Sequence, residues 1–86
     1  MADADGPFRY RPRVLDELAR HGVRPTSESD PHMVRVYVRE LYKYEIRVLR
    51  ARYLRHEFSK AEYGQLVDAL RRQYPVLSLL PQQFVE

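Results

Sequence analysis

The chain has 86 residues, of which 44 % are hydrophobic and 31 % charged, and these proportions are typical of a folded domain rather than a disordered chain. Its net charge of +3 is too small to indicate a nucleic-acid partner by itself. The absence of cysteine excludes disulfides, thiolate metal sites and cysteine nucleophiles. The N-terminus lacks the regions of a secretory signal, and no apolar run reaches the roughly 18 residues of a membrane span, so we expect a cytoplasmic location.

Residues 1–7 are mostly small and acidic and end in the helix-breaking pair Gly6-Pro7, so we expect a disordered tail. Residues 8–86 are then predicted to form a single helical domain. Its first helix should begin near Pro12 and end at Gly22, because proline suits a first helical position and glycine a C-terminal cap. The apolar face of this helix consists of Val14, Leu15, Leu18 and Ala19.

A much longer helix is predicted from Asp30 to Glu57. Asp30-Pro31 is a favourable start, and neither glycine nor proline occurs from Met33 to Glu57. A helix of roughly 27 residues would span about 40 Å, which exceeds the roughly 30 Å width of a small domain. We therefore expect that another chain covers part of it, or that it projects into solvent.

A third helix should start at the capping box that runs from Ser59 to Glu62, and end before Pro75. Because the connection to the long helix is so short, the two helices should form a hairpin or a sharp corner. The segment after Pro75 is too apolar to remain in solvent, with Phe84 as its last anchor. The prediction is a small all-α, three-helix domain with one long central helix and an apolar C-terminal tail packed across it.

The long helix carries a wide apolar face that one short neighbour cannot cover. Glu45 and Arg52 interrupt this face, and each needs a partner if it is buried. Glu45 could pair within the chain with Arg13, Arg71 or Arg72, or it could face Arg52 of a second copy in an antiparallel pair. The predicted interface residues are Val34, Tyr37, Val38, Leu41, Tyr44, Glu45, Val48 and Arg52.

Another side of the long helix carries a basic stripe of Arg35, Arg39, Lys43, Arg47 and Arg50. These cations repel one another. The helical spacing does not place Glu40 or Glu57 where they would neutralise the stripe. A nucleic-acid backbone, an acidic protein or an anionic membrane surface could bind the stripe, or it could be a solvated face.

No catalytic, cofactor or metal motif is recognised. The glycines are too dispersed for a phosphate loop, and the three histidines lack the spacing of helical metal ligands. The sequence therefore predicts a non-enzymatic protein-protein interaction module, a homodimer or small accessory subunit that associates through the long helix. RNA binding or non-specific DNA binding through the basic stripe is the alternative.

Overall fold

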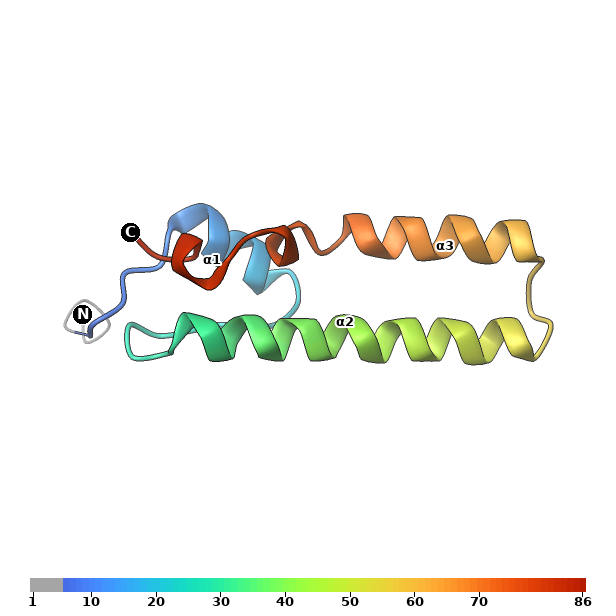
Figure 1. The fold of residues 1–86 in the computed structure, drawn as a ribbon, viewed down its shortest axis with the longest axis horizontal. Helices are drawn as coiled ribbons and strands as arrows, with labels where there is room; N and C mark the ends of the chain where they lie inside the picture. Colours follow the sequence, from blue (N-terminus) through green and yellow to red (C-terminus); the bar gives the residue numbers. More distant parts are fainter. Residues whose placement is uncertain (1–5) are drawn as a thin grey trace.

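The computed structural model describes residues 6–86 and is an all-α, three-helix domain. Its α-helices are α1 (Pro12–Ala19), α2 (Pro31–Leu54) and α3 (Lys60–Arg72), and the short 3-10 helices η2 (Pro75–Ser78) and η3 (Pro81–Gln83) follow. Helices α2 and α3 run side by side in opposite directions, while α1 and the tail cover the N-terminal half of α2 (Figure 1). The predicted fold class is confirmed. Residues 1–5 of the predicted tail lie outside the described residues.

Helix α1 is short and is held by local signals at both ends. Pro12 occupies its first position, and the chain turns away through Gly22, which has a φ of +74°. Glycine adopts this left-handed conformation without the strain that a Cβ would add. The helix itself ends at Ala19, three residues before the predicted cap, and buries Val14 and Leu18.

Helix α2 has 24 residues and is therefore about 36 Å long. The Asp30 carboxylate accepts a hydrogen bond from the His32 N–H at 2.9 Å, which is the predicted N-cap. The predicted end at Glu57 is wrong, because the helix ends at Leu54 and His56 takes a φ of +63°. Side-chain hydrogen bonds from Arg52 at 2.9 Å and Arg55 at 3.0 Å hold Glu57 in the turn and keep its pKa below the usual value.

The turn between α2 and α3 is closed by a capping box and by stacked aromatic rings. Ser59 Oγ accepts from the Glu62 N–H at 3.1 Å, and the Glu62 carboxylate accepts from the Ser59 N–H at 2.8 Å, as predicted. The Tyr53 and Tyr63 rings stack with centroids 4.5 Å apart, and Phe58 lies beside both. These contacts fix the antiparallel hairpin at its far end.

The hydrophobic core lies at the opposite end, where α1 and the tail meet the first half of α2. The tail packs across the helices as expected, and Phe84 and Leu18 are fully buried. Tyr10 pairs with Val85 in an isolated antiparallel bridge, and its hydroxyl donates to the Ser29 carbonyl at 2.5 Å. Burial raises the pKa of Tyr10 to about 12. The other buried apolar residues of this core are Val14, Val38, Tyr74 and Val76.

Arg35 holds the tail in place. Its Nε donates to the Leu79 carbonyl at 2.7 Å and its Nη2 donates to the Leu77 carbonyl at 2.8 Å. These carbonyls lie in and after η2, where no regular ladder satisfies them. The assignment of Arg35 to a ligand-binding stripe is therefore wrong, because its guanidinium is committed to the chain's own backbone.

Candidate interaction surface

The hairpin of α2 and α3 extends well beyond the core. The radius of gyration is 15.7 Å, whereas a compact chain of this length has about 12 Å. No residue from 39 to 73, all of which the structure describes, is buried, and α3 contains no buried residue at all. We call residues 39–73 the arm. The arm is thus a two-helix layer whose apolar side chains remain partly in water.

Large apolar side chains of the arm are exposed along the side of the α2–α3 groove. Tyr44 is 63 % exposed, Val48 is 41 % exposed and Leu66 is 40 % exposed. A depression of about 380 Å³ lies between the two helices, lined by Tyr44, Glu45, Val48, Leu49, Arg52, Leu66, Ala69, Leu70 and Gln73. An adjoining depression of about 540 Å³ shares Tyr44, Glu45 and Gln73 and reaches the end of α1. Together they form one continuous, shallow and mainly apolar groove.

A polar cluster lies in the middle of this groove. The Tyr74 hydroxyl donates to the Glu45 carboxylate, and burial, followed by this hydrogen bond to Glu45, raises the pKa of Tyr74. The His21 ring stacks on Tyr74 with centroids 3.9 Å apart, and its Nε2 donates to the Gln73 carbonyl at 2.7 Å. Since a carbonyl can only accept, His21 Nε2 carries a proton in this hydrogen bond. The cluster joins α1, α2 and the end of α3.

Glu45 therefore has a partner that the sequence did not indicate. Pairing with Arg13, Arg71 or Arg72 is not observed, because the Glu45 carboxylate accepts from Tyr74 instead. Glu45 nevertheless remains exposed at the groove surface, as does Arg52. Both side chains retain the capacity to bind a second group.

The predicted interface residues divide between the core and the open surface. Val38 is fully buried against the chain's own core, so its assignment to an intermolecular interface is wrong. Val34 and Leu41 are half-buried against the same core, while Tyr37 is 53 % exposed. The exposed members are Tyr37, Tyr44, Glu45, Val48 and Arg52.

The sequence analysis missed the contribution of α3 to this surface. Leu66 and Ala69 line the groove, and both are exposed. A helical wheel of α3 would have placed Leu66 to one side of Tyr63, Val67 and Leu70. That offset places Leu66 at the edge of the apolar face of α3, where it lines the groove together with Leu70.

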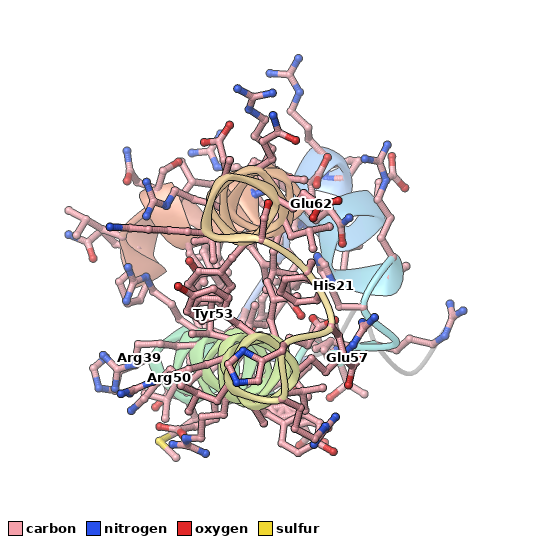
Figure 2. The ribbon with its side chains drawn as sticks, turned by 90° about the vertical axis from the view of Figure 1, so that its right-hand side faces the viewer. His21, Arg39, Arg50, Tyr53, Glu57 and Glu62 are labelled. Atoms are coloured by element: carbon pink, nitrogen blue, oxygen red, sulfur yellow. The ribbon has the colours of Figure 1, made fainter. Side chains whose placement is uncertain are left out.

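Without Arg35, the basic stripe consists of Arg39, Lys43, Arg47 and Arg50, and all four are exposed. Lys43 lies 3.4 Å from Glu40, so the expectation that Glu40 does not neutralise the stripe is wrong for this one position. Among residues 6–86, no acidic group lies within ion-pair distance of the other three. Arg39 and Arg50 project from the side of α2 that faces away from His21 and α1 (Figure 2). Arg39 and Arg50 of the stripe therefore lie on a different side of the arm from the groove.

Within the described part of the chain, no three His, Cys, Asp or Glu side chains are grouped as metal ligands would be. None of the helices described is both long enough and apolar enough to cross a bilayer. No protein-family model, curated protein or solved structure matches the chain.

Proposed function

We propose that this chain is a non-enzymatic protein-protein interaction module that associates through the groove side of its arm. The observation that carries the proposal is the absence of any buried residue over the 35 residues from 39 to 73, beside exposed Tyr44, Val48 and Leu66. Two helices in contact normally bury at least one apolar stripe on each helix. A third layer over the groove would supply the burial that the arm lacks.

The energetic gain available from such a layer is substantial. An aromatic side chain can bury about 150–250 Å², so covering the exposed part of Tyr44 removes roughly 100–150 Å² from water. At about 25 cal/mol per Å², this one residue contributes roughly 2.5–4 kcal/mol before the entropy of association is subtracted. Tyrosine and arginine are also the residue types enriched at binding hot spots, and Arg52 lines the same groove.

Site-specific photo-crosslinking in the native host tests the proposal. A benzophenone amino acid replaces Tyr44 in one strain, Val48 in a second and Arg50, on the basic stripe, in a third. We expect crosslinks to a defined protein from Tyr44 and Val48 and none from Arg50. The proposal fails if the groove positions yield no protein adduct while the protein accumulates in folded form.

Nucleic-acid binding through the stripe is a second candidate, supported by three exposed arginines without an acidic neighbour among the described residues. Four stripe cations that each neutralise a phosphate would give a salt dependence of log K with a slope of about −3.6 on duplex DNA. Arg39→Glu combined with Arg50→Glu should abolish that binding without unfolding the chain. Failure to retain the wild-type protein on RNA or DNA at low salt eliminates this candidate.

The cytoplasmic location expected from the sequence stays a prediction, and fractionation of the native host tests it.

A further inference from the structure

Five apolar residues of α2, four of them exposed, follow a coiled-coil spacing. These residues are separated by alternating intervals of four and three positions. We call them the seam: Tyr37, Leu41, Tyr44, Val48 and Ala51. A four-three alternation is the sequence requirement for one helix to pack along another. All seam residues are exposed except Leu41, which is half-buried. The seam therefore has the spacing that a second helix needs in order to pack along it.

The seam is bordered by one acid and one base on each flank. Glu45 and Arg52 follow it on the flank that lines the groove beside α3, and Glu40 and Arg47 follow it on the outer flank. On each flank the acid precedes the base by seven residues, which is one heptad. All four side chains are exposed, so each could meet a charge on a docked helix.

Resting on the proposed function, we infer that the groove-side occupant is α2 of a second copy of this chain, running antiparallel. In a parallel pair, the outer flank of one helix faces the inner flank of the other, displaced by five residues. Glu40 would then meet Glu45 of the second copy, and Arg47 would meet Arg52. An antiparallel pair brings like flanks together, so Glu45 meets Arg52 and Glu40 meets Arg47. The two-fold symmetry repeats each attraction, giving four complementary pairs.

The same charges and the apolar seam favour one antiparallel register. When Tyr44 packs against Val48 of the second copy, the two-fold axis passes at the level of residue 46, and the acid and base of each of the four pairs are five residues, or about 7.5 Å, apart along the helix axis. A shift by one heptad in one direction places Glu45 opposite Glu45, and a shift in the other direction places Arg52 opposite Arg52. Like charges that face each other across a helical interface are destabilising. The alignment of Tyr44 with Val48 therefore combines apolar packing with acid–base pairs at one common axial spacing on both flanks.

The remaining contacts are compatible with this alignment. Residue 38 lies opposite residue 54 of the second copy, so the paired segment is about 17 residues, or roughly 25 Å, long. Leu66 and Ala69 of α3 lie beside the inner flank, and the two hairpins together would form a four-helix layer. In the single chain, Glu57 forms ion pairs with both Arg52 and Arg55. Glu57 therefore keeps Arg55 as a partner when Arg52 pairs with Glu45 of the second copy.

Charge reversal at the inner flank tests both the partner and its direction. In the antiparallel pair, Arg52→Glu places a second carboxylate against Glu45 at both symmetry-related contacts, and the dimer dissociation constant from sedimentation equilibrium should rise about tenfold at low salt. Glu45→Arg combined with Arg52→Glu should return it to within about threefold of wild type. Arg39→Glu, on the opposite side of α2, is the matched control and should leave it unchanged. In a parallel pair, Arg52→Glu would tighten the dimer instead.

Disulfide trapping gives a second test that does not depend on charge. Because the chain contains no native cysteine, only the introduced cysteines can form a disulfide. Tyr44→Cys and Val48→Cys are made as separate proteins, and both substitutions lie at exposed positions. Mixing them under mild oxidation should give the mixed dimer well above either homodimer. Preferential homodimers of the two variants would overturn the antiparallel alignment.

The two proposals can fail separately. A wild-type chain that is monomeric at 100 µM, together with photo-crosslinks from Tyr44 to a different protein, would overturn the self-association and leave the interaction module intact. The absence of crosslinks from the seam together with a monomer at this concentration would overturn both.

Discussion

Arg35→Ala is expected to detach the C-terminal tail from α2. The guanidinium donates two short hydrogen bonds, to the Leu79 carbonyl at 2.7 Å and to the Leu77 carbonyl at 2.8 Å, and Arg35 is half-buried. A hydrogen bond to a charged group contributes about 1.5–3 kcal/mol. Because water can reach part of this site, we take the lower end for each bond and expect a loss of about 2–3 kcal/mol. In a domain of this size that corresponds to a fall in Tm of roughly 8–20 °C.

Urea unfolding followed by far-UV circular dichroism measures the loss of stability, at one fixed protein concentration so that any self-association contributes equally. Arg39→Ala is the matched control, since Arg39 lies one turn further along α2 and is exposed. It should change the free energy of unfolding by no more than about 0.5 kcal/mol. Equal effects of the two substitutions would refute the structural role assigned to Arg35. Arg35→Lys should recover only part of the loss, because an ammonium group lacks the fork that reaches both carbonyls.

Three further predictions concern the core, the turn and the tyrosines. Phe84→Ala should lower the free energy of unfolding in urea by about 3–5 kcal/mol, because Phe84 is fully buried and the tail has little else to fill its site. An unchanged urea midpoint would contradict the packing of the tail. Ser59→Ala removes half of the capping box and should lower the free energy of unfolding by about 0.5–2 kcal/mol, with faster amide exchange in the first turn of α3 as the local readout. The free energy of unfolding should also fall as the pH rises above 10. The pKa of Tyr10 is near 12 and that of Tyr74 is raised, so both hydroxyls stay protonated in the folded chain. The unfolded chain loses the same protons at lower pH, which favours unfolding. The slope is at most about 1.4 kcal/mol per pH unit for each tyrosine, and Tyr10→Phe should remove its share; a pH-independent midpoint between pH 9.5 and 11.5 would exclude this linkage.

The elements of the fold could be predicted because their signals are local. Asp30-Pro31 and the Ser59 to Glu62 capping box each satisfy backbone groups within a few residues, so no tertiary context is needed to place them. The end of α2 was harder, because Leu54 to Glu57 contain no helix breaker. The helix stops there because Glu57 accepts from Arg52 and Arg55 in a turn that also positions Phe58 under the Arg52 guanidinium.

The candidate surface was predicted only in part because a helical wheel gives directions and not neighbours. It grouped Val38 with Tyr37 and Val48 on one apolar face, yet α1 and the tail cover Val38 completely while the other two remain exposed. Arg35 likewise belongs to the basic stripe by spacing, but the path of the tail brings two carbonyls to it. The path of a segment that follows about 40 residues later along the chain is a tertiary property, and no periodicity in α2 encodes it.

If the arm binds a partner as proposed, its two helices are already ordered before the partner arrives. The arm lacks a core of its own, yet the Ser59 cap, the stacked Tyr53 and Tyr63 rings and the Glu57 ion pairs hold both helices in position. A surface that is already ordered loses little conformational entropy when a partner covers it, so more of the burial energy of Tyr44 and Val48 becomes affinity. The same residues gain little within the monomer, where half or more of Tyr44 remains in water. Local interactions therefore maintain the shape of the arm, and on the proposed function the hydrophobic stabilisation of this surface would come from association.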